Sequence, residues 1–385
     1  MRGQILILTT GIAVTGSNSL VLSPILSDVA AGLGTSPVTV SYALAAYGGA
    51  TALSAFFLAP WIDRVGGRTA LLGGMAALLL ATLLSAAATR WPVLVLAQAV
   101  AGLGAGVVLP SIYALAAGLA APGREAETLG RVLTGWSVSL VAGVPLAALA
   151  SDLAGWRMPF LLLACLAAGA LVGTLRLPDA RVPPAPRRGP LAPLGDRGVP
   201  ALLVICLAYM SAFYGVYAFL GDHLRATLGV SAVAAGLVVL TYGIGFGLAS
   251  LADRWLDRVG PRRVFPLTLL AIALIYLALV PGSATGLWAA ASITGLWGFA
   301  NHLGLNTLIL LLASIRPDQR GAVLGLNSAV TYLGAMLGTG TAGILYPHGG
   351  FAATTVAAAL ALVLAALVAA RPLAPAEPRP QSARP

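Results

Sequence analysis

Several long stretches of this chain contain no charged residue and are almost entirely apolar, and this feature constrains the fold more than any other. Clear examples are Leu71–Ala88, Met158–Leu175, Val264–Val280 and Ala352–Ala370. Each is close to the ~20 apolar residues that a helix needs to cross a bilayer. Because backbone groups inside lipid must be hydrogen-bonded within the protein itself, these stretches predict membrane-spanning helices.

The composition of the whole chain agrees with this prediction. Charged residues make up 9% of the sequence and hydrophobic residues 59%. A soluble domain carries about 25% charged residues. With so few charges, 385 residues could not cover a water-facing surface. The two cysteines, Cys165 and Cys206, lie in apolar stretches and are expected to be buried apolar side chains, and no metal site or cofactor is expected.

All 22 basic residues are arginines, and their positions predict the topology. Apolar spans divide the chain into loops, and alternate loops hold nearly all of the arginines. One set of loops contains only Arg90, Arg157 and Arg225, whereas the opposite set contains all the others. Because basic residues are enriched in cytoplasmic loops, we expect both termini in the cytoplasm and the chain in a bacterial inner membrane. The net charge of +10 therefore reflects topology, and no nucleic-acid partner is expected.

The order of the spans predicts two halves, 1–177 and 199–370. The stretch between them, 178–198, is rich in proline and arginine and is expected to be a cytoplasmic linker. The tail, 371–385, is expected to be disordered in the cytoplasm. The first apolar stretch is longer than a signal-peptide core, so we expect it to be retained as the first helix. Helices are expected near 4–26, 38–61, 70–88, 92–117, 130–150 and 157–177, and near 199–221, 231–252, 264–281, 287–313, 322–346 and 351–370.

The two halves repeat each other in sequence. Asp63-Arg64-Val65-Gly66-Gly67-Arg68 recurs as Asp257-Arg258-Val259-Gly260-Pro261-Arg262, at an offset of 194 residues (from 63 to 257). Other pairs lie near the same offset, such as Tyr47-Gly48 with Tyr242-Gly243. Parallel repeats in a membrane protein imply a pseudo-two-fold axis along the membrane normal, with the ligand site between the halves.

The repeated segment resembles the signature G-x-x-x-D-R-x-G-R-[RK] that follows helix 2 in the major facilitator superfamily. Ala59 replaces its first glycine and Gly67 replaces an arginine. The resemblance covers nearly the whole chain and implies an all-α polytopic membrane protein, with about twelve transmembrane helices in two pseudo-symmetric six-helix halves. The residues that agree with the signature are Asp63, Arg64, Gly66 and Arg68 in the first copy and Asp257, Arg258, Gly260 and Arg262 in the second.

A second resemblance lies in the expected fifth helix. Gly143-Val144-Pro145-Leu146, followed by Gly155-Trp156-Arg157 and Phe160, is similar to G-x-P-L-G-G and G-W-R-x-x-F of the drug/proton antiporter branch, although Ala147-Ala148 replaces the last two glycines. Within that branch the chain is similar to bacterial sugar-efflux and chloramphenicol-efflux members. This resemblance implies a secondary active transporter that exports small organic solutes or drugs by alternating access, coupled to proton influx, as in multidrug resistance.

The motif residues also predict moving parts. Asp63 can pair with Arg68 and with the positive N-terminal end of a neighbouring helix, for which the resemblance suggests helix 11, starting near Gly321. We expect the two motif copies to form a conformational latch that holds the outward-facing state; the alternative is a solvated loop whose arginines only fix topology.

Three residues of helix 5 are expected to form a hinge. Gly135, Gly143 and Pro145 permit close helix contact and a local bend. The alternative is that they are ordinary residues of a membrane helix, because glycine and proline are common there.

Proton coupling calls for an ionisable group within the membrane. The family's helix-4 signature has an arginine four residues before a glycine, but here Gln98 precedes Gly102, so coupling through that arginine is in question. His302 lies deep in an expected span and is the first candidate. The alternative is a neutral histidine hydrogen-bonded to an adjacent helix. Asp28, at the outer end of helix 1, is the second candidate, unless it is a loop carboxylate.

Polar and aromatic residues on helices 1, 4, 7, 10 and 11 form the expected substrate cavity. In this family helices 1, 4, 7 and 10 line the cavity, and such a lining suits a neutral or amphipathic solute. The alternative is that these residues serve interhelical packing. The expected cavity residues are Asn18, Gln98, Tyr113, Tyr209, Phe213, Tyr217, His302, Asn306 and Asn327.

Other functions are weaker fits. An importer, either a symporter or a uniporter, is the main alternative, because no carboxylate lies in the middle of an expected span. An enzyme would need a converging nucleophile, base or metal set, which the sequence does not suggest, and a sensor would move no solute. The chain has no P-loop and no lysine, so we expect no direct use of ATP. We expect a monomer whose partners are a small-molecule substrate, protons and the lipid bilayer.

Overall fold

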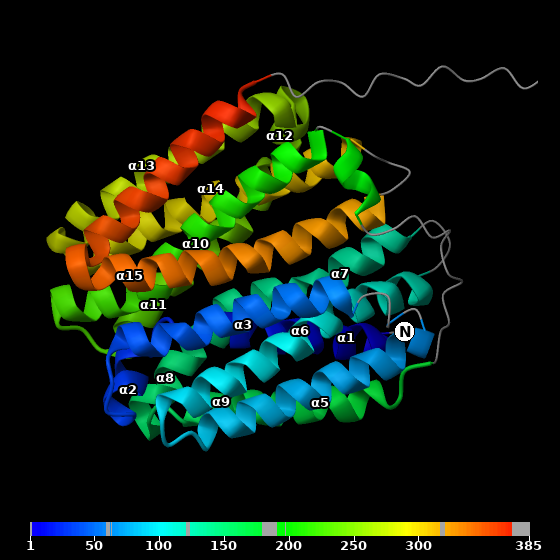
Figure 1. Cartoon of the computed structure of the whole chain (residues 1–385), viewed down its shortest axis with the longest axis horizontal. Helices are drawn as coiled ribbons and strands as arrows, with labels where there is room; N and C mark the ends of the chain where they lie inside the picture. Colours follow the sequence, from blue (N-terminus) through cyan, green and yellow to red (C-terminus); the bar gives the residue numbers. More distant parts are fainter. Residues whose placement is uncertain are drawn as a thin grey trace, which may run out of the picture.

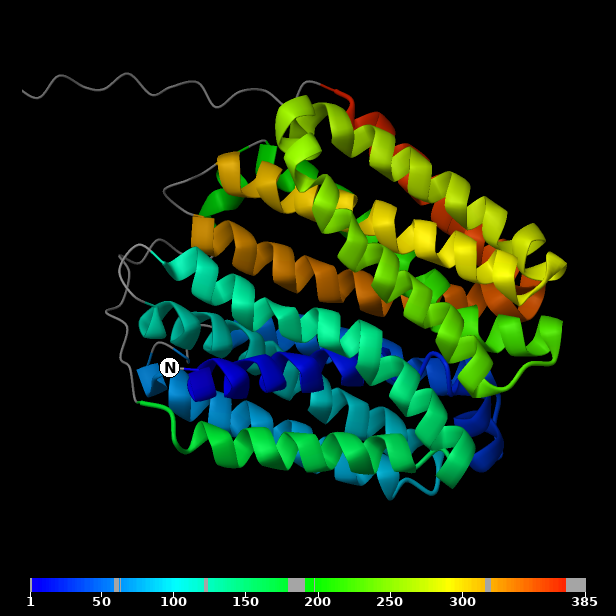
Figure 2. The same ribbon diagram turned by 180° about the vertical axis from the view of Figure 1, so that it is seen from behind.

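The computed structural model describes residues 2–58, 62, 64–120, 124–178, 191–196, 198–315 and 320–371, and within these ranges all regular structure is helical. The helices form two stacked bundles, one from the N-terminal part of the chain and one from the C-terminal part (Figure 1). The N-terminus and the last turns of the final helix lie towards the same end of the molecule, as the views from both sides show (Figures 1 and 2). The all-α polytopic prediction is confirmed.

The N-terminal bundle contains the first half of the expected spans. Its first span is broken, because Pro24 has no N–H to donate to the carbonyl of Leu20, which instead accepts from the N–H of Ser23 at 3.2 Å. The elements are α1 (Arg2–Leu20), α2 (Leu26–Gly32), α3 (Pro37–Phe57), α5 (Gly67–Ala86), α6 (Trp91–Leu119), α7 (Glu125–Val138), the π-helical turn η1 (Ser139–Gly143), α8 (Val144–Ala154) and α9 (Met158–Thr174).

The C-terminal bundle follows the same plan. Its first helix is longer than expected, because no glycine or proline interrupts it between Gly221 and Gly229, where a φ of 64° ends it. The elements are η2 (Ala192–Gly195), α10 (Gly198–Leu228), α11 (Ala232–Leu248), η3 (Ala249–Ala252), α12 (Asp253–Val259), α13 (Pro261–Thr285), α14 (Leu287–Ile315) and α15 (Arg320–Ala369).

Nine helical stretches in the described residues are long and apolar enough to cross a membrane. One of them, Ala322–Ala369, has 48 residues and folds back at Gly350 (φ 62°, ψ −161°), so it supplies two spans. The shorter apolar helix Met158–Thr174 and helix α1 supply the others. This agrees with two halves of six spans each, which are numbered helices 1 to 12 below.

The backbone repeats between the halves at the glycines that end or begin helices. Gly66 and Gly260, the glycines of the two motif copies, have φ of 87° and 91° and precede α5 and α13. Only glycine adopts such angles without strain. Ser36 and Ser231 each accept a hydrogen bond at 3.2 Å from the third residue after them and so cap α3 and α11. The sequence repeat is therefore also a repeat of local structure.

Large apolar side chains cover the outside of the bundles. Leu153, Leu251 and Trp288 are 77%, 80% and 86% exposed, as expected for residues that face lipid. Cys206 is buried, but Cys165 is exposed, which corrects the expectation that both are buried. The reason is that α9 packs mainly on α5, α1 and α8, so its remaining face is free to contact lipid.

Candidate substrate pathway between the two halves

Two helix pairs join the halves. α3 packs along the first part of α15, and η1 with α8 packs on α11. Glycines allow close approach: a Cβ added at Gly48 would lie 2.8 Å from the backbone N of Met336, and one at Gly243 would lie 3.2 Å from the backbone of η1. Between the halves, the rings of Tyr47 and Tyr332 meet edge to face, with centroids 6.3 Å apart. The interface therefore consists of helix 2 (α3) with helix 11 (the first part of α15) and of helix 5 (α7, η1 and α8) with helix 8 (α11).

Charged and polar contacts close the end of this interface that lies away from the two termini, and we call it the outer end because the predicted topology places it outside the cell. An Nη of Arg225 lies 2.6 Å from Oδ1 of Asp28, and these side chains are only 21% and 27% exposed. Beside this ion pair, Ser27 donates to one oxygen of Asp222 at 2.6 Å, and the hydroxyl of Tyr346 donates to the other at 2.7 Å. Asp28, which the sequence offers as a proton-uptake candidate, is thus one partner of an ion pair between the halves.

Asp152 adds a second outer contact, between helices 5 and 8. Its Oδ2 accepts a hydrogen bond at 3.0 Å from the backbone N of Val233, in the first turn of α11. The first N–H groups of a helix have no partner within the helix and carry partial positive charge, so a carboxylate there is favourable. On the other side of the interface, Ser23 donates to the carbonyl of Tyr217 at 2.5 Å.

Helix 5 contacts helix 8 near the outer end of the interface but not near the opposite, inner end. Its outer part, η1 and α8, contacts α11, whereas α7 makes no comparable contact with any described helix of the C-terminal half. Beside the outer contact, and not along α7, a groove of about 300 Å³ is lined by residues of η1, α8 and α11 that include Val141, Pro145, Val233 and Leu237. The described part of the interface is therefore closed at its outer end and parted along α7.

The expected hinge residues lie around the π-helical turn η1. Pro145 has no N–H to donate to the carbonyl of Val141, and the wider turn just before it accommodates this loss. Gly143 and Gly135 pack on helix 1: added Cβ atoms would lie 2.1 Å from Oγ of Ser17 and 2.4 Å from the carbonyl O of Thr9. Helix 5 is thus irregular where the hinge is predicted, and its motion stays a prediction.

Two expected cavity residues of the N-terminal half bind each other. Asn18 donates from its amide to Oε1 of Gln98 at 3.1 Å, and Gln98 donates to Oγ of Ser85 at 3.0 Å. Both amides are about 1% exposed. Gln98 therefore links helix 1 (α1), helix 3 (α5) and helix 4 (α6). It occupies the position at which the helix-4 signature described above has an arginine. Tyr113 on helix 4 is only partly buried.

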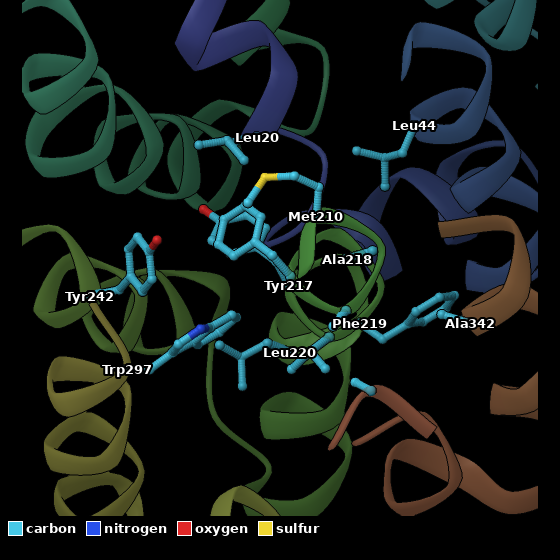
Figure 3. Packing of buried hydrophobic residues seen from close by; sticks show 14 of the residues in the cluster. Leu20, Leu44, Met210, Tyr217, Ala218, Phe219, Leu220, Tyr242, Trp297 and Ala342 are labelled. Atoms are coloured by element: carbon cyan, nitrogen blue, oxygen red, sulfur yellow. The ribbon is translucent and has the colours of Figure 1, made fainter. Parts of the chain in front are cut away.

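The expected cavity residues of helix 7 join a larger aromatic group. Tyr209 donates at 2.7 Å to Oδ1 of Asn301, whose amide donates at 2.6 Å to the hydroxyl of Tyr242. Figure 3 shows Tyr217, Tyr242 and Trp297 near one another, with Leu20 of the other half beside Tyr217. The ring centroids of Tyr217 and Trp297 are 6.3 Å apart. Sequence analysis gave no role to Trp297 or Asn301, although their spacing of four residues places them on one face of α14.

Six tyrosines from five helices surround the centre of the interface, and we call them the tyrosine cluster. The ring centroids of Tyr47 and Tyr332 are 6.3 Å apart, as are those of Tyr217 and Tyr242. Phe213 lies between Tyr214 and Tyr217, at 4.9 Å from the first ring and 5.5 Å from the second. Both halves contribute to the cluster, whose members are Tyr47, Tyr113, Tyr214, Tyr217, Tyr242 and Tyr332.

His302 binds a carboxylate that the sequence analysis did not connect with it. Its Nε2 lies 3.1 Å from Oδ1 of Asp253, and Asn306 donates to the same oxygen at 3.0 Å. The face that carries His302 packs closely on helix 8, because an added Cβ at Gly298 would lie 2.0 Å from the carbonyl O of Tyr242. The structure thus pairs His302 with a neighbouring element, and its role as a substrate or proton site stays a prediction.

A second histidine lies within a helix that was expected to end before it. His223 of α10 is bonded at 2.8 Å to Oγ of Ser283 and stacks on Phe351 with ring centroids 4.3 Å apart. The sequence placed it outside the span, because the expected helix 7 ended near 221. Because no glycine or proline lies between Gly221 and Gly229, the sequence could have predicted that this helix continues past His223.

The latch falls largely outside the described residues. Asp63 lies outside them, and so do the side chains of Asp257 and of the start of α15. The guanidinium of Arg68 donates to the carbonyl of Leu175. Arg64, Arg258 and Arg262 are exposed, and Gly66 and Gly260 have the matching conformations described above. The latch therefore stays a prediction.

Two similar helical halves pack on each other, and the contacts between them are stronger at one end than at the other, which is the arrangement of a membrane transport protein. The sequence matches the Major Facilitator Superfamily over residues 7–315 and again over residues 201–385, and the chain belongs to that family. The fold agrees, since the crystal structure of a D-xylose-proton symporter matches with a TM-score of 0.78 at 17% identity, over 96% of this chain and 97% of that one.

Curated relatives extend over most of the chain. The uncharacterized MFS-type transporter YwfA of Bacillus subtilis is 28% identical over 93% of this chain and 89% of its own length. A chloramphenicol resistance protein of Streptomyces lividans is 26% identical over 82% of this chain and 83% of its own. A probable sugar efflux transporter of Mannheimia succiniciproducens is 27% identical over 66% of this chain and 64% of its own.

Proposed function

We propose that this chain is a secondary active transporter that exports small organic solutes by alternating access, coupled to proton influx across the bacterial inner membrane. The observation that carries the proposal is the uneven interface, which is tied at its outer end by Asp28 and Arg225 and parted along α7 at the other. This arrangement suits a state in which the central site takes up solute from the cytoplasm.

Two observations support export as the direction of transport, namely the sequence and structure of helix 5 and the names of two relatives. The sequence Gly143-Val144-Pro145-Leu146 resembles the motif of the antiporter branch, and here it adjoins an irregular turn that contacts helix 8. Two relatives carry names that denote resistance to chloramphenicol and efflux of sugar. The second name describes export, and a membrane protein that confers resistance is consistent with it, so the two relatives support export by this chain.

In the proposed cycle the two halves rock about the central site. Solute enters between α7 and the C-terminal half and reaches the tyrosine cluster. The contacts of Asp28, Asp152 and Asp222 at the outer end then break, and the motif segments close the inner end. The bend at η1 lets the outer part of helix 5 move with helix 8 while α7 stays packed on helix 1.

The pair of His302 and Asp253 is the proposed proton site. Together these groups can gain or lose a proton while their hydrogen bond of 3.1 Å persists. An aromatic chain connects the pair to the tyrosine cluster, because the ring of Phe246 lies 4.9 Å from that of His302 and stacks on Tyr242 at 6.1 Å. Movement at either site is therefore transmitted to the other by direct contact.

Flux in everted membrane vesicles tests the proposal. Respiration acidifies the interior of such vesicles, so a proton-coupled exporter should accumulate radiolabelled chloramphenicol or D-xylose there, and an uncoupler should abolish the accumulation. Vesicles without the protein provide the background. Accumulation by intact cells that an uncoupler prevents would instead identify an importer and contradict the proposal.

A further inference from the structure

The tyrosine cluster has the position of a binding site between the two halves. Tyr47 and Tyr113 come from the N-terminal half and the other members from the C-terminal half, so a solute among them would touch both halves. Tyr113 and Tyr214 are only partly buried, although they face the interior. Phe213 places further ring surface behind the cluster, with its centroid 4.9 Å from that of Tyr214. A flat aromatic group is the solute that such surfaces contact best.

The helices that carry most of the tyrosine cluster provide no charge beside it to neutralise a charged solute. The helices α3, α6 and α11 contain no charged residue, and α10 has only Asp222 and Arg225, near its outer end. Both of those residues already hold partners at the outer closure. A net charge within the bilayer costs several kcal/mol when nothing compensates for it. The solute that fits this site is therefore uncharged.

The side-chain amides of the interior are largely paired with one another. Those of Asn18, Gln98 and Asn301 bind other side chains. In the described part of the chain, the buried groups without a partner include the hydroxyl of Tyr217, the indole N–H of Trp297 and the amide oxygens of Asn18 and Asn327. Tyr217 is only 2% exposed, so water does not solvate its hydroxyl in this state. A flat solute with one or two hydrogen-bonding groups can satisfy some of these atoms, whereas a sugar carries hydroxyls around its whole ring, and those that face aromatic side chains would stay unbonded and reduce affinity.

We infer that the tyrosine cluster binds an uncharged, flat aromatic solute with one or two hydrogen-bonding groups, in preference to sugars and to charged aromatic compounds. The inference rests on the proposed function and narrows its substrate class. It also favours an aromatic solute over a sugar, the solute class in the name of the efflux relative from Mannheimia succiniciproducens.

Binding to the purified full-length protein tests the inference without any flux. We would titrate three compounds of nearly equal shape, 2-naphthamide (neutral), 2-naphthoate (anion) and 2-naphthamidine (cation), together with D-xylose, by calorimetry in detergent. Protein-free micelles correct for partitioning. We expect 2-naphthamide to bind at least about tenfold more tightly than either charged compound, which corresponds to ~1.4 kcal/mol. No binding of D-xylose is expected at the same concentrations.

Two tyrosine variants locate the site. Tyr217→Phe keeps the ring and removes the free hydroxyl, and it should weaken 2-naphthamide binding by about three- to tenfold. Tyr42→Phe is the control, because Tyr42 is 45% exposed and its ring packs on Trp91 and not on a member of the cluster; it should leave binding unchanged. Retained thermal stability of both variants would confirm that they fold.

The outcomes separate this inference from the proposed function. Equal binding of the three naphthyl compounds, tighter binding of D-xylose, or equal effects of the two tyrosine variants would overturn the substrate class. Export of another solute in vesicles would still be measurable in that case. Conversely, failure of every solute to accumulate in vesicles would overturn export, even if 2-naphthamide binds selectively.

Discussion

Asp28 and Arg225 form an ion pair of 2.6 Å between residues that are 197 positions apart and belong to opposite halves. Asp28 lies on α2, and its counterpart in the repeat is Asp222 on α10, at the offset of 194 residues that relates the motif copies. Each of these carboxylates reaches a residue of the other half, Asp28 through Arg225 and Asp222 through Ser27. The outer closure therefore has the pseudo-symmetry of the fold.

Removing either charge of this pair should open the outer end more often. Because both side chains are partly exposed, we expect Asp28→Asn or Arg225→Gln to weaken the closure by about 1 kcal/mol, a roughly fivefold change in the ratio of closed to open molecules. Spin labels on cysteines at Ala31 and Ala226, in a background without Cys165 and Cys206, would report the distance across the outer end. The exchanged pair Asp28→Arg with Arg225→Asp should recover part of the closure, and identical distance distributions in all variants would contradict the prediction.

Helix 5 should not tolerate side chains where it touches helix 1. A Cβ at Gly135 would lie 2.4 Å from the carbonyl O of Thr9, so Gly135→Val should destabilise the protein by ~1–3 kcal/mol through overpacking. Gly130→Val on the same helix is the control, because nothing lies within 4 Å of its added Cβ. Thermal unfolding in detergent measures both variants, and equal melting temperatures would show that the two helices can separate without loss.

The proposed proton site should couple transport to the gradient without being needed for solute movement itself. Asp253→Asn and His302→Gln should abolish accumulation driven by a pH gradient and should also flatten its pH dependence. Exchange of labelled for unlabelled solute at equal pH should continue, because no net proton movement is needed for it. Asp196→Asn serves as the control, since its carboxylate accepts a hydrogen bond from the N–H of Gly198 and is not part of this pair. Gradient-driven accumulation that persists in both variants would exclude this pair.

The motif carboxylate can be tested without knowledge of its contacts. Asp63→Asn should slow transport at least about tenfold, provided that the latch is worth ~1.4 kcal/mol or more, while the protein still inserts into the membrane. Arg64→Gln tests whether the exposed arginines of the loop contribute only to topology, in which case transport should change little. Unaltered flux in Asp63→Asn would reject the latch in favour of a solvated loop.

The sequence predicted the positions of the helices well, because lipid imposes length and the absence of charge on every span. It predicted the repeat for a similar reason, since Gly66 and Gly260 must adopt the same positive φ. It did not predict which side chains meet. Apolar residues of a membrane helix face both lipid and protein, so hydropathy does not fix the rotation of a helix about its axis. The pairing of His302 with Asp253, 49 residues apart, depends on that rotation.

The broken segments were also hidden from the sequence. Pro145 suggested a bend in helix 5, but the π-helical turn at 139–143 depends on how helix 5 fits between helices 1 and 8, and the break at Pro24 falls inside a helix that was expected to run over 4–26. Likewise, the outer closure uses Arg225 on a part of α10 that the sequence placed in a loop.

The π-helical turn has a consequence for any change in the length of helix 5. A π turn accommodates one residue more than an α turn, so deleting a single residue between Ser139 and Gly143 would restore a regular helix. Because the wider turn absorbs its extra residue within one turn, the segment beyond it would keep nearly the same orientation relative to α7, and Asp152 would stay beside the first turn of α11. A single deletion in the regular helix α8 before Asp152 would instead rotate that side chain by about 100°. Whether a one-residue deletion falls inside the π turn or in α8 thus decides whether helix 5 still presents Asp152 to helix 8.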